Sequence, residues 1–260
     1  MMKKCDTIVK ILLSAFVFCA AVFVCGCVDI DKSYMAEKML WQADRKVNLL
    51  LQKATKENRQ LRYSEVDEMV AAYKKVSDRF PLEQKAARAQ FSIADIYVRV
   101  RKFDDARREL TRVIQNFSSV PVIASRAQVQ IAQTFEQEKK FSEAIQEYEK
   151  VRDLYPLTPL GLQVPLHIMR FYKQRDDKAN EQKAYRQAVR HYSDLLNQFA
   201  GTSTAGFYHS YIALTHIEAE EWERAIETGD AIIAAYPDTP FAARAIASKA
   251  EIYVNNLKNI

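Results

Sequence analysis

Histidine and cysteine are the residues of this chain that could first be expected to carry chemistry. The chain of 260 residues contains four histidines, His167, His191, His209 and His216. His209 and His216 could share one face of a helix, but no carboxylate completes a metal-binding spacing such as His-Glu-x-x-His. We therefore expect His216 to replace an aromatic core residue, and the sequence predicts neither a metal site nor a bound cofactor.

Motifs for nucleophilic or phosphate chemistry are absent from the sequence. The chain has only 5 glycines and contains neither a glycine-rich nucleotide loop nor a Gly-x-Ser-x-Gly nucleophile elbow. All four cysteines lie within the first 27 residues, at Cys5, Cys19, Cys25 and Cys27, so the rest of the chain has no thiol nucleophile. We therefore predict no catalytic residue and a protein that is not an enzyme.

Composition indicates an all-α fold. Hydrophobic residues make up 48% of the chain and charged residues 27%, which is typical of a folded protein. The scarcity of glycine, together with only 7 prolines, disfavours a β protein rich in tight turns. The first 26 residues contain three lysines and one aspartate, so without them the net charge falls from +5 to +3, which is too small to imply a nucleic-acid partner.

The first 26 residues have the pattern of a bacterial export signal. Lysines at positions 3, 4 and 10 precede or begin an uncharged run from Ile11 to Val24. As a helix, this run would be about 21 Å long. Because the hydrocarbon core of a bilayer is about 30 Å thick, the run fits a signal peptide better than a permanent span.

The run ends in small residues followed by Cys27, an arrangement that resembles the lipobox of bacterial lipoproteins. The resemblance implies a signal peptide over 1–26, a diacylglycerol on Cys27 and a tether over 27–33. A plain secretory signal and a short uncleaved anchor are the alternatives. Because Val28 rather than aspartate follows Cys27, the resemblance implies the periplasmic face of an outer membrane, provided that the organism has one.

The body of the chain repeats one pattern of small, aromatic and alanine positions. Three stretches share identical offsets: Ala94, Tyr97, Phe103, Ala106 and Phe117; Ala132, Phe135, Phe141, Ala144 and Tyr155; and Ala213, His216, Trp222, Ala225 and Tyr236. Two distorted copies close at Phe80 and Phe199, so the closing aromatics follow at steps of 37, 38, 44 and 37 residues. The sequence therefore predicts five helical hairpins. The fourth has extra residues near 175–181, which we expect to lengthen both of its helices by about one turn.

This pattern resembles the tetratricopeptide repeat, although its period is longer than the usual length of about 34 residues. The extra residues form joints in which Thr158 and Thr239 suit helix N-caps, and Pro159 and Pro240 suit the first helical position. Such joints, with five hairpins behind a lipidated cysteine, are similar to the outer-membrane assembly lipoproteins of the BamD family. The resemblance implies a right-handed helical-hairpin solenoid over residues 34–260.

Both ends of this predicted solenoid have helices of their own. Residues 34–58 place apolar side chains along one face of a long helix, at Ala36, Leu40, Ala43, Val47, Leu50 and Ala54. Ser64 is expected to cap the helix that follows. From Phe241 onward, a last amphipathic helix is expected to cover the open end of the stack.

In tetratricopeptide arrays the first helix of each hairpin lines the concave side, so the resemblance implies a partner-binding groove. The repeat register places ten candidate residues in it: Arg88, Phe91, Asp95, Arg99, Arg126, Gln133, Glu136, Arg170, Lys173 and Phe207. Apolar side chains beside arginines suit a peptide segment that carries carboxylates. The basic run over 99–112 is interleaved with acidic residues and is interpreted as a solvated face.

These patterns predict a lipid-anchored periplasmic scaffold that binds envelope proteins or peptide segments, within the machinery that assembles outer-membrane β-barrels. A lipoprotein of pilus or secretin assembly, or an envelope coordinator of the Tol–Pal type, would use the same residues, and only the identity of the partner separates them. An enzyme that acts on peptidoglycan or lipid is the competing class of function.

Overall fold

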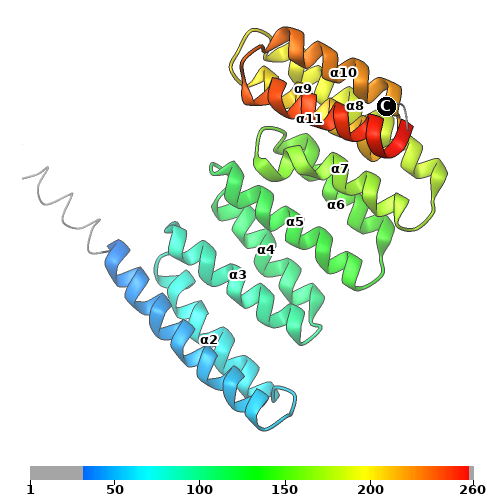
Figure 1. Ribbon diagram of the computed structural model, residues 1–260. Helices are drawn as coiled ribbons and strands as arrows, with labels where there is room; N and C mark the ends of the chain where they lie inside the picture. The colour runs from blue at the N-terminus through cyan, green and yellow to red at the C-terminus, as the bar shows by residue number, and fades with distance from the viewer. Residues whose placement is uncertain (1–31, 258–260) are drawn as a thin grey trace, which may run out of the picture. The chain divides into compact units, whose positions relative to one another are not determined.

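The computed structural model describes residues 32–257, in which every regular element is a helix (Figure 1). After an N-terminal helix over 32–56 come α2 (Tyr63–Arg79), α3 (Gln84–Arg99), α4 (Phe103–Asn116), α5 (Pro121–Gln137), α6 (Phe141–Leu154), α7 (Pro159–Lys173), α8 (Lys178–Gln198), α9 (Ala205–Glu218), α10 (Trp222–Ala235), α11 (Pro240–Ile252) and a π-helical turn, η1 (Tyr253–Leu257). The predicted all-α fold is confirmed. The predicted signal peptide and Cys27 lie outside the described residues.

The chain divides into two compact units between Ala144 and Ile145, within α6. The first unit contains the N-terminal helix and α2 to α5, and the second contains α7 to α11. Helices that follow one another along the chain pack together within each unit, as α3 does with α4 and α9 with α10 (Figure 1). The helical hairpins predicted from the repeat pattern are therefore present in both units.

One turn geometry joins the two helices of a hairpin. A single residue adopts the left-handed backbone conformation in each turn, with φ between 55° and 61°, at Arg101, Lys139, Asp176 and Glu220. The following amide N–H then donates to the carbonyl five residues earlier, at 2.8–3.1 Å, and the acceptors are Tyr97, Phe135, Tyr172 and His216. In all four turns the acceptor is the carbonyl of the residue at the aromatic position of the repeat. This residue is therefore always the same number of residues away from the turn.

The joints between hairpins follow the predicted capping pattern. The Thr158 hydroxyl accepts a hydrogen bond from the backbone N–H of Gly161 at 3.0 Å, and a proline begins α7. Thr239 caps α11 in the same way, with a longer bond of 3.4 Å. Gly161 is needed in this tight joint, because a Cβ there would lie 1.9 Å from the carbonyl oxygen of Tyr155.

The extra residues of the fourth hairpin all enter its second helix. Helix α8 has 21 residues, whereas the second helices α4, α6 and α10 have 14 each, and α7 with 15 is no longer than α3 or α5. The prediction that both helices lengthen is therefore wrong. The turn keeps its fixed distance from Tyr172, so the insertion follows the turn. Its seven residues amount to about two helical turns, which keeps Ala188 and Tyr192 on the buried side.

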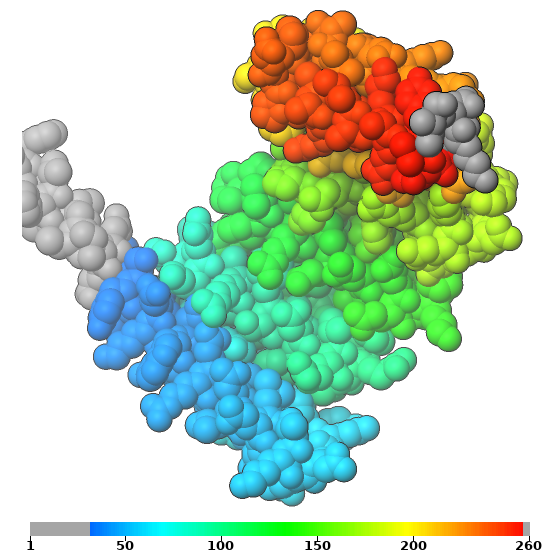
Figure 2. All heavy atoms as spheres, viewed as in Figure 1, coloured from blue at the N-terminus to red at the C-terminus, as the bar shows by residue number. Residues whose placement is uncertain are grey.

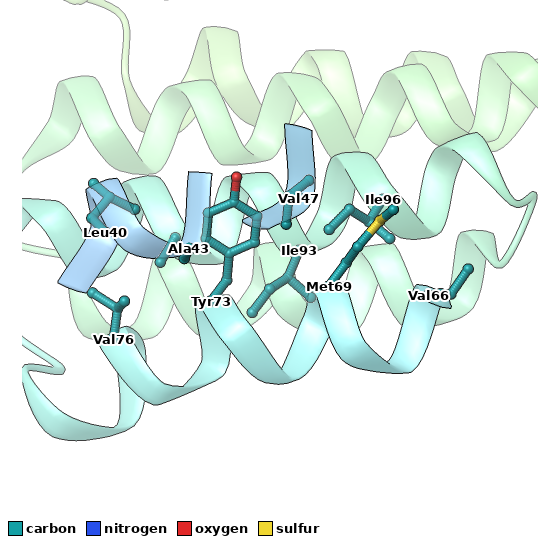
Figure 3. Packing of buried hydrophobic residues seen from close by; sticks show 10 residues of the cluster. Leu40, Ala43, Val47, Val66, Met69, Tyr73, Val76, Ile93 and Ile96 are labelled. Atoms are coloured by element: carbon teal, nitrogen blue, oxygen red, sulfur yellow. The ribbon is translucent and has the colours of Figure 1, made fainter. Parts of the chain in front are cut away.

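The N-terminal helix packs against α2 and α3 and forms one core of the first unit with them (Figure 3). Leu40, Ala43 and Val47 of this helix belong to the same core as Met69, Tyr73 and Val76 of α2. The predicted apolar stripe is buried along its length except at Leu50, which is half-buried. The predicted helix therefore exists, over 32–56 rather than 34–58.

Helix α2 begins differently from the prediction. Its N-cap is Arg62 rather than Ser64. The Glu65 carboxylate accepts a hydrogen bond from the backbone N–H of Arg62 at 2.9 Å and two more from the Arg59 guanidinium at 2.8 Å. The Glu65 carboxylate thus supplies the glutamate half of a capping box, in which the third helical residue accepts from the backbone N–H of the N-cap residue.

The C-terminal helix α11 packs on α10 and α9, as predicted for a cap. Gly206 allows this close approach, because a Cβ at this position would lie 2.6 Å from the Phe241 ring. Ala242, Ala245 and Ile252 are buried in the contact. Covering the last hairpin in this way keeps the apolar faces of α9 and α10 away from water.

Candidate partner-binding surfaces

The first helices α3 and α5 contact each other in the first unit. The Arg126 guanidinium of α5 lies 4.5 Å from the ring centroid of Phe91 on α3. Phe91 is only 5% exposed and belongs to the core beneath, so this predicted groove residue does not present its ring to a partner. The surface of α3 and α5, which we call the first-helix face, instead exposes Asp95, Arg99, Arg126 and Gln133.

Charge on the first-helix face is distributed around Asp95. Loss of hydration raises the pKa of the Asp95 carboxyl, and the positive charges of Arg126 and Arg99 oppose that shift. Within residues 32–257, neither arginine forms an ion pair with a carboxylate. Both guanidinium groups can therefore still bind a carboxylate from another molecule.

Two other predicted residues of the first unit are less available. Arg88 donates to the Asp44 carboxylate of the N-terminal helix at 3.0 Å, so its charge is already matched. Glu136 is half-buried on α5. The structure therefore places the exposed polar part of the predicted groove at Asp95, Arg99, Arg126 and Gln133.

The basic run over 99–112 has two parts with different environments. In helix α4, Arg112 pairs with Glu109 at 2.7 Å, and Arg108 pairs with Asp105. This part agrees with the predicted solvated face. Each pair joins residues three apart on one helix, where side chains are neighbours.

Arg107 departs from the predicted solvated face, because its side chain is only 12% exposed. It pairs with Glu138 and Asp104, donates to the Thr134 hydroxyl at 3.1 Å and lies 4.2 Å from the Phe135 ring centroid. Sequence spacing could not predict these contacts of Arg107, because three of its four partners come from the next hairpin.

The other part of the run borders a hollow that the sequence analysis did not find. Arg99, Arg101 and Lys102 surround about 450 Å³ together with Arg59 and Tyr63, and apolar residues of the N-terminal helix complete the wall. We call this site the basic hollow. Arg59 is held by Glu65, but the other three cations form no ion pair with a carboxylate in the part of the chain that the structure describes.

The turn explains why these charges are unpaired. Arg101 is the left-handed residue of the turn, so helical spacing does not bring it toward Asp104 or Asp105. Lys102 instead lies 5.6 Å from the ring centroid of Tyr63, which is 80% exposed. Three cations beside an exposed aromatic ring are suited to bind a carboxylate-bearing protein segment.

In the second unit, the predicted groove cations are used within the fold. Arg170 of α7 donates to the Glu218 carboxylate at 2.9 Å, and Lys173 donates to Glu220 at 2.7 Å and to the Glu218 carbonyl at 2.9 Å. The hydrogen bond from Arg170 lowers the pKa of Glu218. These contacts hold α7 against the end of α9.

Phe207 is the predicted groove residue with the most accessible aromatic ring, at 52% exposure. It borders an apolar hollow of about 380 Å³ between α9, α10 and α11, lined by aliphatic residues such as Leu214 and Ile232. Its ring meets that of Phe241 edge-on, with centroids 5.0 Å apart. The second unit therefore offers an apolar surface, whereas the first offers cations.

His216 lies in the core, as expected. It is 7% exposed, and its Nδ1 is 3.0 Å from the Tyr185 hydroxyl, which also accepts from Arg224 at 2.8 Å. Burial and the charge of Arg224 lower the pKa of His216. A neutral imidazole in this hydrogen-bonded position fills the place that an aromatic ring has in other repeats.

Between residues 32 and 257, no three histidine, cysteine or acidic side chains come together as a metal ion would require. Nor does any helix in that range have the length and apolar character needed to cross a bilayer.

Comparison with known families agrees with the hairpin architecture. The family model of the tetratricopeptide repeat matches residues 91–159, from the middle of α3 to the first residue of α7. A search of curated proteins gives no match. The chain is therefore an all-helical repeat protein that carries tetratricopeptide-like hairpins, and such repeats generally bind other proteins.

Three solved structures show a distant likeness. A protein from Podosopora anserina with nearly identical TPR-like repeats has 14% identity and a TM-score of 0.41, over 80% of this chain and 99% of its own. BtubC (BKLC) from P. vanneervenii has 14% identity and a TM-score of 0.37, and the match covers 83% of this chain and 92% of its own. The C-terminal part of a TPR repeat-containing protein from Cytophaga hutchinsonii has 15% identity and a TM-score of 0.37, and the match covers 82% of this chain and 74% of its own. At these TM-scores, the likenesses carry nothing about function.

Proposed function

We propose that this protein is a lipoprotein of the outer membrane, anchored at its periplasmic face through acylated Cys27, and that it binds protein partners of the β-barrel assembly machinery. The anchoring is supported by the lipobox-like end of the apolar run at Gly26 and Cys27. The assignment to β-barrel assembly is supported by the resemblance of the repeat joints to those of the BamD family.

The observation that carries the binding function is the set of unpaired cations in the first unit. Arg99, Arg101 and Lys102 border the basic hollow, and Arg126 lies on the adjoining first-helix face. Cations on a fold hold acidic partners by steering their approach and by charge-assisted hydrogen bonds. The partner segment is therefore acidic, and it binds across α3 and α5 with a carboxylate in the basic hollow.

Site-specific photo-crosslinking in the native host tests this proposal. A photoreactive residue at Gln133 lies on the first-helix face, whereas one at Gln115, which is exposed on the second helix α4, serves as the matched control. We expect an adduct from Gln133 and none from Gln115, with a β-barrel assembly component identified by mass spectrometry. An adduct with a pilus, secretin or Tol–Pal component would support the scaffold function and contradict the assignment to β-barrel assembly. The absence of an adduct at Gln133 would contradict the binding surface.

Charge reversal tests the chemistry of the partner. Arg101→Glu with Lys102→Glu should weaken capture of the same partner on the order of tenfold or more, because two attractive charges become repulsive. Lys74→Glu with Lys75→Glu makes the same change in net charge at two adjacent exposed lysines of α2 and should leave capture unchanged. Equal losses in both variants would show that only net charge matters.

A further inference from the structure

The outward face of the N-terminal helix carries exposed apolar and basic side chains in one stripe. The side chains recur at three- and four-residue steps as far as Leu49, with Lys56 seven residues further, on the side of the helix opposite its buried stripe (the helix is blue in Figure 2). We call them the outer stripe: Tyr34, Lys38, Trp41, Arg45, Leu49 and Lys56. The stripe extends about 33 Å along the helix, from position 34 to position 56.

The three apolar members of the stripe are far more exposed than core residues of the same kind. Tyr34 is 63% exposed, Trp41 58% and Leu49 59%. The Arg45 guanidinium lies 5.7 Å from the Trp41 ring centroid. Two aromatic rings and a leucine that are exposed along one helix indicate an interaction surface for a membrane or for another protein.

The charges of this helix are sorted between its two sides. Its two acidic residues lie outside the outer stripe and pair with other helices: Glu37 pairs with Lys85 at 3.4 Å, and Asp44 accepts hydrogen bonds from Arg88 at 3.0 Å and from the Tyr73 hydroxyl at 2.8 Å. The outer stripe has no acidic member. Lys38, Arg45 and Lys56 belong to it, and none of them forms an ion pair within the described residues.

We propose that the outer stripe lies on an anionic phospholipid bilayer, with Tyr34, Trp41 and Leu49 in the interfacial layer and the three cations at the lipid phosphates. A helix with aromatic and leucine side chains among basic residues, and without acidic ones, has the character of a membrane-surface helix. A protein partner would need a matching acidic groove about 33 Å long, whereas a bilayer provides a flat anionic surface of any length.

The position of this helix in the chain supports a lipid surface. Cys27 lies five residues before Lys32, the first described residue of the helix. Five extended residues reach at most about 18 Å, so a lipid on Cys27 would hold the start of the helix close to the headgroups. The inference rests on the anchoring part of the proposed function, and it adds a second contact to the membrane.

The two tryptophans of the chain allow a local test in the full-length protein. Trp222→Phe leaves Trp41 as the only tryptophan, and Trp41→Phe leaves the half-buried Trp222 of α10 as the reference. The acylated protein is reconstituted in vesicles of phosphatidylethanolamine and phosphatidylglycerol whose acyl chains are brominated. We expect Trp41 fluorescence to shift to the blue and to be quenched by the brominated lipid, while Trp222 is unaffected.

Two variants test whether charge holds the stripe on the lipid. Each lysine or arginine near an anionic surface contributes about fivefold to binding, so Lys38→Glu, Arg45→Glu and Lys56→Glu together should weaken the contact on the order of 100-fold or more. The Trp41 emission of this variant should return to that of a water-exposed ring. The control changes three exposed cations of α8 in the same way, with Lys183→Glu, Arg186→Glu and Arg190→Glu, and should keep the quenching.

The results separate the possible occupants. Trp41 that stays open to aqueous iodide and is not quenched by brominated lipid would overturn the proposal. A blue shift without lipid quenching would also overturn it, because it would show that a protein surface, either a partner or a second copy, covers the stripe. Acylation is measured separately by mass spectrometry of the mature N-terminus, and partner capture by crosslinking at Gln133, so failure of the proposed function is distinguishable.

Discussion

We expect Arg107 to contribute strongly to the free energy of unfolding of the first unit, and Arg107→Met tests this. Its guanidinium joins α4 to α5 through Glu138, Thr134 and the ring of Phe135. Methionine keeps much of the apolar cover of the ring and removes the charge and its hydrogen bonds. The substitution therefore isolates the polar contribution of this contact.

The magnitude follows from the exposure of the partners. The Arg107 and Glu138 side chains are 12% and 18% exposed, so their charge-assisted hydrogen bond is largely shielded from water and contributes about 1.5–3 kcal/mol. Loss of the cation–π contact adds about 0.5–1 kcal/mol. The pair with Asp104 adds little, because that side chain is 88% exposed. Since Glu138 keeps Lys140 at 2.9 Å, we expect a total loss of about 2–3 kcal/mol.

Urea unfolding followed by the loss of helical circular dichroism is the assay, and the unfolding midpoint of each variant gives the change in stability. Arg108→Met is the matched control. The Arg108 side chain is 71% exposed and pairs only within α4, so the loss of its charge should cost less than about 0.5 kcal/mol. A double-mutant cycle with Glu138→Gln should give a coupling of at least about 1 kcal/mol. If Arg107→Met cost no more than Arg108→Met, the reasoning from burial would be refuted.

Three further predictions concern the anchor, acid stability and the turns. Cys27→Ser should block acylation and leave the precursor uncleaved, and a mature protein that still starts at residue 27 with acyl chains, seen by mass spectrometry, would contradict the lipobox. The hydrogen bond from Arg59 lowers the pKa of Glu65 to about 2, so Glu65 stabilises the fold above its unfolded pKa of about 4.3, and this contribution is lost as the pH falls toward 2. Glu65→Gln should flatten the dependence of the urea midpoint on pH in this window, and an unchanged slope would contradict the pairing. Lys139→Gly should stabilise the protein by about 0.5–1 kcal/mol in thermal unfolding, because glycine adopts its left-handed conformation without strain, whereas glycine at the exposed Gln146 within α6 should destabilise it.

The hairpins were predictable because their signals are local. The Thr158 cap needs only its own hydroxyl and an amide three residues later, and the turn motif needs a carbonyl and an amide five residues apart. The buried stripe of the N-terminal helix follows from helical periodicity alone. Such signals are fixed by backbone geometry, so they can be located in the sequence without knowledge of what packs against them.

Local signals did not predict the structure where the sequence allowed two local arrangements of the same segment. Ser64 was a plausible cap, but the helix begins after Arg62, whose backbone N–H donates to a Glu65 carboxylate that Arg59 also holds. The extra residues of the fourth hairpin could have entered either helix, and they enter α8 because the turn after Tyr172 keeps its own geometry. In both cases a neighbouring contact decided between structures of similar local energy.

The candidate surfaces show the same division. The sequence placed Phe91, Arg126 and Arg170 on first helices, and their helices are as predicted. Only packing decided that Arg126 covers Phe91 and that Arg170 is bound to Glu218, which is 48 residues away. The sequence by itself therefore determined the helices, the threonine caps at Thr158 and Thr239 and the repeat register. The tertiary structure decided which charges are neutralised and which remain free, because ion pairing depends on distances between helices that periodicity does not specify.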